Sequence, residues 1–380
     1  MFTMIRGAEV YSPEKAGRQD ILICNDKIVD IGRSLHFDYP GLQEIQARGM
    51  LAVPGFLDQH VHITGGGGED GFRSRIREID ITQLIRGGIT TVVGLLGTDG
   101  TTRSMENLVA KTKALNEEGV TAYCLTGSYE YPSPTLTGSV AKDIMFIQEI
   151  LGLKLAISDH RGSSMTEQEI IRAASEVRRA SLLSGKPGLI CFHTGPGKDG
   201  LQQLIHIAES SDIPIDLFRP THVARVLPDA IAFAQMGGRI DFTAGRSTVR
   251  LADRLRTVLA SVPPDRITLS SDGNGSSPRF DKDKRLTGMS VSSVSQLWNA
   301  VRALVRDGVL PLEQALAFIT VNPASALGLY PKKGTLRPDA DADIVLLKGM
   351  EIETVIAKGQ IMMRDGKLLA KGYYQYNESE

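Results

Sequence analysis

Eight short apolar runs, separated by longer amphipathic stretches, constrain the fold more than any other feature of this sequence. The runs lie between residue 51 and about residue 275 and read LAVPGFLDQHVH, TTVVGLLG, TAYCLTGSY, LKLAISD, GLICFHTG, IDLFRPTHV, RIDFTAG and RITLSSDG. Stretches such as 104–119 and 166–185 lie between them, with apolar residues at the three- and four-residue spacing of a helix. Eight strand–helix repeats with fully buried strands predict an α/β fold of the TIM-like (β/α)8 barrel type. A doubly wound sheet is the alternative, because a sequence does not show the order of its strands.

Both ends of the chain depart from this pattern and predict a second, β-rich part. Residues 1–50 contain short strands with polar turns, and residues 335–369 contain more, with Lys-Gly and Asp-Gly steps that suit hairpins. We therefore expect a small β-sandwich-like domain built from residues 1–52 and 331–380, and a barrel domain over residues 53–330. The tail, YYQYNESE, is expected to be exposed.

Composition argues against several classes of function. The 43 basic and 44 acidic residues are well mixed, so nothing predicts binding to nucleic acid or to a membrane surface. The three cysteines lie far apart in apolar runs, which indicates reduced, buried thiols. No apolar stretch has the length of a membrane span or a signal peptide, so we expect a cytoplasmic protein.

Several polar residues lie where the predicted strands end, which is where barrels of this type place their chemistry. His60 and His62 close the first run, and side chains two apart on a strand point to the same side. Later runs end with His193, His222 and Asp272. Neutral imidazoles and a carboxylate are suitable Zn²⁺ ligands. A single buried histidine is commonly structural, but this set predicts a metal site.

Lys154 interrupts the otherwise apolar run LKLAISD. Burying a protonated ammonium group is unfavourable, so the position needs an explanation. One interpretation is a lysine whose head group reaches solvent or Asp159. The other is a carbamate formed with CO₂, an anion that offers one oxygen atom to each of two metal ions.

These features together resemble the amidohydrolase superfamily, which has a binuclear metal centre. The segments DQHVHITGGGGE, VVGLLGTD, LTGSY, AISDHR, PTHVAR and LSSDGNGS are similar, more narrowly, to the isoaspartyl (β-aspartyl) dipeptidase family. The resemblance implies two Zn²⁺ ions per chain, bridged by a hydroxide and by N6-carboxylated Lys154. It assigns ligands to both ions: His60, His62 and Asp272 to the first, and His193 and His222 to the second. His160 is also near a strand end but matches no ligand of the family.

The resemblance implies a metallo-dipeptidase that hydrolyses the β-aspartyl amide bond and releases aspartate and an amino acid. The bridging hydroxide would attack the carbonyl carbon, while Asp272 takes a proton and returns it to the departing amine. Tyr129, just beyond the third strand, is placed to hydrogen-bond the developing oxyanion. Its alternative role is to cap the rim of the barrel.

The predicted strand-end loops also offer groups that complement such a substrate. The resemblance implies that Glu69 would bind the α-amino group and that Arg161, Arg225 and Ser276 would bind carboxylates, although which arginine takes which carboxylate stays open. Surface ion pairing is the alternative for both arginines. The other expected contacts with the substrate come from Gly67 and Thr98. Gly67 belongs to four consecutive glycines that let the chain approach a ligand; no GK[ST] follows, which argues against a phosphate loop.

Other functions stay open on the same scaffold. A cyclic-amide hydrolase of the hydantoinase or dihydroorotase kind, or an N-acyl-amino-acid deacylase, would use the same metals without needing Glu69. A non-enzymatic scaffold protein is disfavoured, because all six ligand positions are filled. The resemblance also suggests a homo-oligomer.

Overall fold

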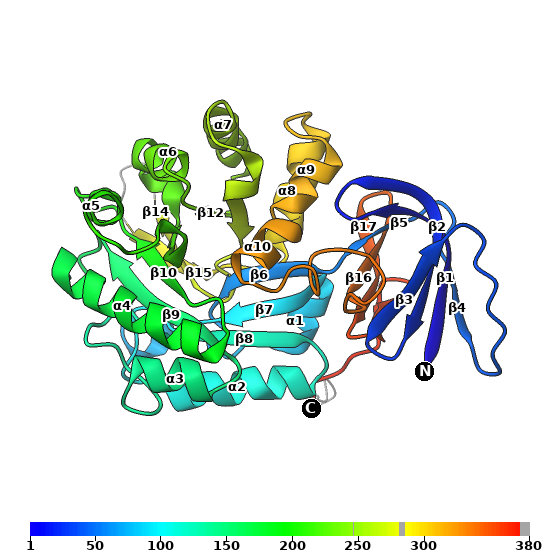
Figure 1. The fold of residues 1–380 in the computed structure, drawn as a ribbon, viewed down its shortest axis with the longest axis horizontal. Helices are drawn as coiled ribbons and strands as arrows, with labels where there is room; N and C mark the ends of the chain where they lie inside the picture. Colours follow the sequence, from blue (N-terminus) through cyan, green and yellow to red (C-terminus); the bar gives the residue numbers. More distant parts are fainter. Residues whose placement is uncertain (246, 281–285, 373–380) are drawn as a thin grey trace.

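A curled parallel sheet forms the larger part of the protein, a computed structural model of which describes residues 1–245, 247–280 and 286–372 (Figure 1). Six strands pair in chain order: β6 (Phe56–Val61), β7 (Ile89–Gly94), β8 (Thr121–Gly127), β9 (Ile150–Ile157), β10 (Leu189–Thr194) and β11 (Phe218–Thr221). Two more, β12 (Ile240–Thr243) and β13 (Ile267–Ser270), pair in parallel with each other. A parallel bridge between Val61 and Gly273 connects the end of β13 to β6.

These eight strands coincide with the eight predicted runs. The six paired strands follow the chain without a reversal of direction, whereas a doubly wound sheet reverses at a switch point. The doubly wound alternative is therefore wrong, and the curled parallel sheet has the character of a TIM-like barrel.

Helices cover the outside of the curled sheet (Figure 1). In the described residues they are α1 (Ile81–Arg86), α2 (Met105–Glu117), α3 (Val140–Phe146), α4 (Glu167–Ser184), α5 (Gln202–Ser210), α6 (Leu227–Gln235), α7 (Thr248–Leu259), α8 (Gln296–Arg306), α9 (Leu312–Ala317) and α10 (Val321–Ala326). Short 3-10 turns are η1 (Phe72–Ser74), η2 (Ile215–Leu217), η3 (Val223–Arg225) and η4 (Pro264–Arg266). The two helices predicted at 104–119 and 166–185 are confirmed as α2 and α4, and they begin at the N-caps Ser104 and Thr166.

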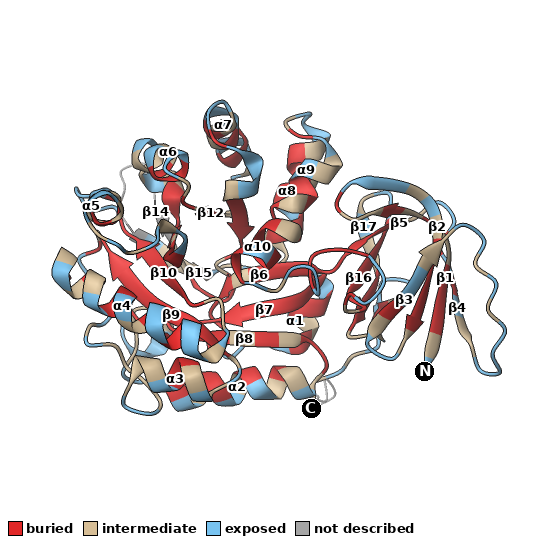
Figure 2. Ribbon diagram, in the orientation of Figure 1, coloured by how far each residue is buried: buried red, intermediate tan, exposed pale blue. Residues whose placement is uncertain are grey.

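Burial explains why the strands read as continuous apolar runs. Every residue of β7, β9 and β10 is buried, because the barrel interior lies on one face and the helices on the other (Figure 2). The polar exceptions in these strands, Lys154 and His193 among them, are therefore buried too.

Strands from both ends of the chain pair into one nine-stranded sheet beside the barrel (Figure 1). Its order is β19 (Lys367–Leu368), β18 (Gln360–Arg364), β17 (Glu351–Ala357), β16 (Ile344–Lys348), β5 (Leu51–Pro54), β1 (Phe2–Tyr11), β2 (Lys15–Cys24) and β3 (Lys27–Gly32), with β4 (Gln43–Gln46) also on β1. Both predicted hairpin steps, Lys358-Gly359 and Asp365-Gly366, have positive φ at both residues, as tight hairpin turns require. The division into two domains stays a prediction, and the tail at 373–380 lies outside the described residues.

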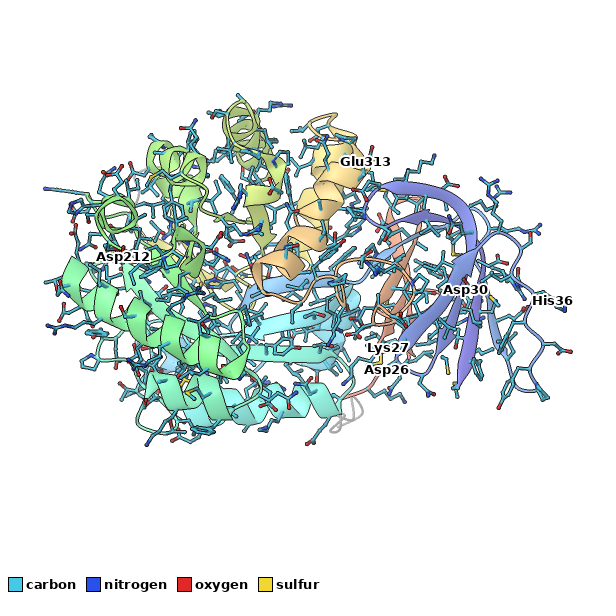
Figure 3. All side chains as sticks on the ribbon, viewed as in Figure 1. Asp26, Lys27, Asp30, His36, Asp212 and Glu313 are labelled. Carbon is cyan, nitrogen blue, oxygen red and sulfur yellow. The ribbon has the colours of Figure 1, made fainter. Side chains whose placement is uncertain are left out.

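Further expectations concern the surface and the thiols. Figure 3 shows Asp30 and His36 at the sheet end of the molecule and Asp212 at the barrel end. All three cysteines are free; Cys124 and Cys191 are buried as predicted, but Cys24 is half-buried because it closes strand β2. Within the described ranges, none of the helices combines the length and hydropathy needed to cross a membrane.

Candidate active site

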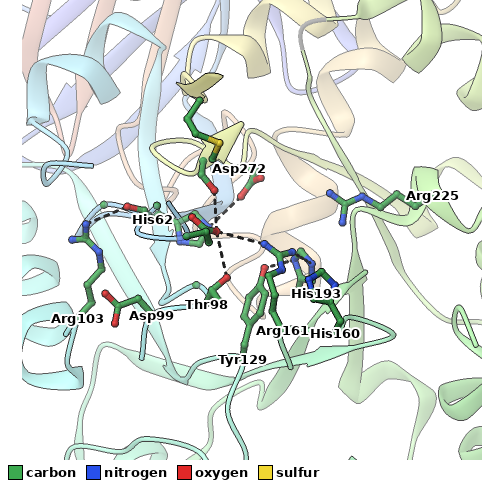
Figure 4. A pocket seen from close by; sticks show the side chains of 17 residues that line it. His62, Thr98, Asp99, Arg103, Tyr129, His160, Arg161, His193, Arg225 and Asp272 are labelled. Carbon is green, nitrogen blue, oxygen red and sulfur yellow. Dashed lines mark hydrogen bonds and ion pairs between the residues drawn. The ribbon is translucent and has the colours of Figure 1, made fainter. Parts of the chain in front are cut away.

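A cavity of about 420 Å³ opens where the barrel strands end (Figure 4). Most of the predicted site residues line it: His62, Gly67, Glu69, Thr98, Tyr129, Arg161, His193, Arg225, Asp272 and Ser276. The remaining three, His60, Lys154 and His222, are buried close to this cavity. After β13 the chain forms an antiparallel hairpin, β14 (Ser276–Phe280) and β15 (Leu286–Val291), which adds Met289 to the lining.

The predicted metal ligands converge next to this cavity. Candidate ligand atoms of His60, His222 and Asp272 all lie within 4.8 Å of one another. Asp272 Oδ1 lies 3.2 Å from His62 Nε2 and 3.5 Å from His60 Nε2. The ring of His193 completes the group, with its centroid 4.7 Å from that of His222.

The backbone at two of these positions is bent into the left-handed region. The φ angle is 60° at His222 and 53° at Asp272, which is uncommon for residues other than glycine. His222 directly follows β11 and Asp272 lies two residues after the end of β13, so both bends fall where the barrel strands end. Such conformations cost free energy and cluster at functional sites.

Burial sets the protonation of the ligand group. It lowers the pKa of His60 and His222 well below the ordinary value, and that of His193 to about 3. Burial alone would raise the pKa of Asp272, but the neighbouring histidines, His222 first, outweigh it and lower that pKa. In addition, Nδ1 of His62 is buried without a hydrogen-bond partner in the described part of the chain. Neutral imidazoles, a carboxylate and an unpartnered ring nitrogen form a donor set that fits a divalent metal ion such as Zn²⁺.

Lys154 lies on β9 and is fully buried. Its Nζ atom contacts Cys191 Sγ at 3.7 Å, and no carboxylate of the described residues forms an ion pair with it. The interpretation in which the head group reaches solvent or Asp159 is therefore wrong. Burial lowers the pKa of Lys154, which favours the neutral amine, the form that reacts with CO₂.

The predicted substrate-binding groups surround the carboxylate of Glu69. Its Oε1 atom lies 3.1 Å from Ser276 Oγ and 3.5 Å from both Thr98 Oγ1 and Arg161 Nη1. Arg225 donates to the carbonyl oxygen of Thr194 at 3.1 Å and has no ion-pair partner among the described residues, so surface ion pairing does not explain it. Asp99 and Arg103 also line the cavity, but Asp99 accepts hydrogen bonds from the backbone of Thr101 and Thr102 and Arg103 donates to backbone carbonyl oxygens. Glu69, Arg161 and Arg225 are therefore the charged lining groups outside the ligand group that we consider for substrate binding.

The glycine segment packs against neighbouring backbone as well as lining the cavity. Gly65 has φ 85°, and a Cβ atom added there would lie 2.1 Å from the carbonyl oxygen of Ile76. Arg103, which the sequence analysis missed, holds the same segment by donating to the carbonyl oxygens of Thr64, Gly66 and Ile76. No sequence signal distinguishes this arginine from an exposed one.

Asp159 is the second residue that the analysis missed as a member of the site. Its side chain is fully buried and accepts hydrogen bonds from Arg161 and from His193. Burial alone would raise the pKa of Asp159, but these partners outweigh it and hold the pKa well below the usual range. The motif AISDHR places an acid at a strand end, which was an available signal. His160, beside it, is exposed and lies apart from the group formed by His60, His222 and Asp272.

Comparison with known proteins agrees with this fold. Residues 240–362 match the amidohydrolase family. The chain is 24% identical to an adenine deaminase of Bacillus pumilus over 92% of its own length, and it spans 55% of that protein. It is 24% identical to an L-hydantoinase of Paenarthrobacter aurescens, covering 94% of this chain and 87% of that protein.

The curled parallel sheet and the strand-end His/Asp group define an enzyme of the amidohydrolase superfamily, whose members generally bind metal ions. A crystal structure of β-aspartyl dipeptidase from Fervidobacterium islandicum AW-1, in complex with β-Asp-Leu, superposes with a TM-score of 0.92. That match has 40% identity and covers 98% of this chain and 100% of the other. The chain belongs to the β-aspartyl (isoaspartyl) dipeptidase family of this superfamily.

Proposed function

We propose that the protein is a metal-dependent dipeptidase that hydrolyses the β-aspartyl amide bond and releases aspartate and a free amino acid. The observation that carries this proposal is a set of charges, Glu69 with Arg161 and Arg225, that lines the same cavity as members of the predicted ligand group. A β-aspartyl dipeptide has one ammonium and two carboxylate groups, which this set complements. The relative that binds β-Asp-Leu supports the same substrate class.

The proposed cofactor is a pair of Zn²⁺ ions. His60, His62 and Asp272 would hold one ion and His193 and His222 the other, with carboxylated Lys154 as a shared ligand. When bound, such a pair lowers the pKa of a water molecule and polarises a carbonyl group.

Two residues of the chain would handle protons at the scissile bond. Asp272, whose lowered pKa keeps it ionised at neutral pH, accepts the proton that the attacking water loses and returns it to the departing amine nitrogen. Burial raises the pKa of Tyr129 well above its ordinary value, so its hydroxyl stays protonated and can donate to the carbonyl oxygen. In this structure the same hydroxyl lies 2.5 Å from Nδ1 of His193, at the edge of the ligand group.

The rim residues would orient the dipeptide. The carboxylate of Glu69 pairs with the α-ammonium group, and the two guanidinium groups and the Ser276 hydroxyl bind carboxylates. Thr98 and the backbone N–H of Gly67 complete the polar lining on the Glu69 side. This arrangement disfavours α-linked dipeptides, because moving the amide to the α-carbonyl displaces one carboxylate relative to the ammonium group.

The test is leucine release from β-Asp-Leu and from α-Asp-Leu by the zinc-loaded protein, with a His60→Ala variant as the metal-site control. We expect cleavage of the β-linked peptide alone, and its loss in the variant. If neither peptide is cleaved although two metal ions are bound per chain, the substrate class is wrong. Hydantoins and N-acyl amino acids would then be tested, since a hydantoinase is among the relatives.

A further inference from the structure

Asp159 contacts both a predicted metal ligand, His193, and a predicted substrate-binding residue, Arg161. It follows strand β9 and Ser158, whose φ of 52° turns the chain so that the carboxylate points inward. The Asp159 side chain is fully buried. On one side it contacts His193, and on the other it contacts Arg161; Figure 4 shows these two partners next to each other on the cavity wall.

The contact with His193 determines which ring nitrogen carries the proton. His193 Nε2 lies 2.9 Å from Asp159 Oδ2, and an ionised carboxylate can only accept a hydrogen bond. The proton of the neutral ring is therefore on Nε2, and Nδ1 keeps its lone pair. Nδ1 accepts a hydrogen bond from the Tyr129 hydroxyl, and Tyr129 lines the cavity. The lone pair is thus directed into the site, as a metal ligand requires.

The contact with Arg161 fixes a guanidinium group in one plane. Asp159 Oδ1 accepts from Arg161 Nε at 2.9 Å, and Oδ2 accepts from Nη2 at 2.7 Å. This paired geometry is stronger and more directional than a single hydrogen bond. The backbone N–H of Arg161 also donates to Oδ1 at 3.0 Å, so Asp159 accepts from His193 and three times from Arg161. The Nη1 atom of Arg161 stays available on the Glu69 side, 3.5 Å from that carboxylate.

We propose that Asp159 is a positioning residue that couples metal binding to substrate binding, by holding His193 in its ligand tautomer and Arg161 in its carboxylate-binding orientation. This inference rests on the function proposed above. The alternative is that the Asp159–Arg161 pair only stabilises the loop after β9. The two roles differ in what the loss of the negative charge does to zinc retention and to KM.

The variant Asp159→Asn distinguishes the positioning role from a role in stabilising the loop after β9. Its single amide oxygen can replace only one of the two carboxylate oxygens. With that oxygen at the Oδ2 position the NH₂ group faces the N–H donors of Arg161 at Oδ1, and in the other orientation the NH₂ group faces Nε2 of His193, so the negative charge and the contact with one of the two partners are lost. The matched control is Asp20→Asn in the nine-stranded sheet. Asp20 also pairs with an arginine, Arg6, at 3.0 Å and also accepts a backbone N–H, but far from the barrel site.

Zinc retention is measured first, by chelator competition followed by metal analysis of each protein. We expect Asp159→Asn to bind the zinc ion assigned to His193 and His222 about 10- to 100-fold less tightly, as changes to residues that hold a metal ligand do. With zinc in excess, KM for β-Asp-Leu should rise about tenfold or more, because Arg161 loses a charged partner. Asp20→Asn should change neither quantity. Equal zinc retention and equal KM in both variants would overturn the proposal.

A measurement on the wild-type protein covers the case in which the variant does not fold. Ring ¹⁵N chemical shifts of His193 in the metal-free protein should show a protonated Nε2 and an unprotonated Nδ1; a proton on Nδ1 would overturn the proposal. The zinc comparison needs no turnover. If the wild type binds two zinc ions but does not cleave β-Asp-Leu, the proposed function fails, while the zinc and tautomer results still decide the role of Asp159.

Discussion

Replacing Glu69 with glutamine tests the substrate assignment with little change in structure. The glutamine keeps an Oε1 atom that can accept the hydrogen bond from Ser276 Oγ, 3.1 Å away, so the side chain should stay in place while its charge is lost. A hydrogen bond to a charged group contributes about 1.5–3 kcal/mol, and about 1.4 kcal/mol corresponds to a factor of ten. Because the Glu69 side chain is 26% exposed and solvent screens it in part, we expect the lower end of that range. The kcat/KM for β-Asp-Leu should therefore fall by about 10- to 30-fold.

The assay compares two substrates, β-Asp-Leu and its N-acetyl derivative, which has no ammonium group. The Glu69→Gln change should weaken turnover of the first and leave the second nearly unchanged, with unaltered zinc content. Glu78→Gln serves as the control, since Glu78 does not line the cavity and contacts Asn107 instead. Equal losses on both substrates would refute the reasoning, because the lost interaction would then not involve the ammonium group.

The remaining predictions concern stability. Arg103→Met removes the donor to three carbonyl oxygens of the glycine segment and should destabilise the protein by about 3 kcal/mol, about 1 kcal/mol per hydrogen bond, in urea unfolding; an unchanged midpoint would contradict this. Lys154→Met in the metal-free protein should raise the urea midpoint, because an apolar chain of similar length replaces a buried amine without an ion-pair partner in the described residues, and it should abolish zinc binding. A lower midpoint would show that the lysine stabilises the fold. For His193, burial lowers the folded pKa to about 3, below the ~6.5 of an unfolded histidine, so the folded chain binds fewer protons between these values. Lowering the pH through this window should therefore reduce the free energy of unfolding by about 1.4 kcal/mol per pH unit because of His193. In the metal-free protein, His193→Gln should reduce the slope of the unfolding free energy against pH by the same amount.

The barrel strands could be predicted because their burial on both faces leaves a strong local signal. Runs such as TTVVGLLG contain no charged residue, and the helices between them show regular apolar spacing, so each element is recognisable from its own residues. The hairpins at Lys358-Gly359 and Asp365-Gly366 were predictable for the same reason, since two adjacent positive φ angles leave a glycine signature. By contrast, the order of the nine-stranded sheet depends on contacts between β5 and β16, almost 300 residues apart, and no local pattern encodes that pairing.

The site was predictable where the residue type is unusual for its place, and not elsewhere. Histidines at strand ends and a lysine inside an apolar run stand out, and the structure brings them together. Arg103 did not stand out, because charged residues in loops are ordinary in a sequence, and the strand-end position of Asp159 was a signal only for a polar site residue, not for its contacts with His193 and Arg161. Their importance comes from burial, which only the fold reveals: Arg103 is 6% exposed and Asp159 is 7% exposed.

The residues that form the site lower the stability of the fold at the strand ends, and binding of a metal ion would offset part of that loss. A buried lysine, buried histidines and a carboxylate occupy positions where apolar side chains would stabilise the barrel more. His222 and Asp272 add left-handed backbone, which costs about 1–3 kcal/mol at each position. A ligand that binds only the folded chain stabilises the folded state by about 4 kcal/mol when its concentration is a thousand times its Kd. The polar residues that interrupt the buried apolar strands β6, β9 and β10 are thus explained by what the cavity binds, and they mark the site because the fold alone gives no reason for them.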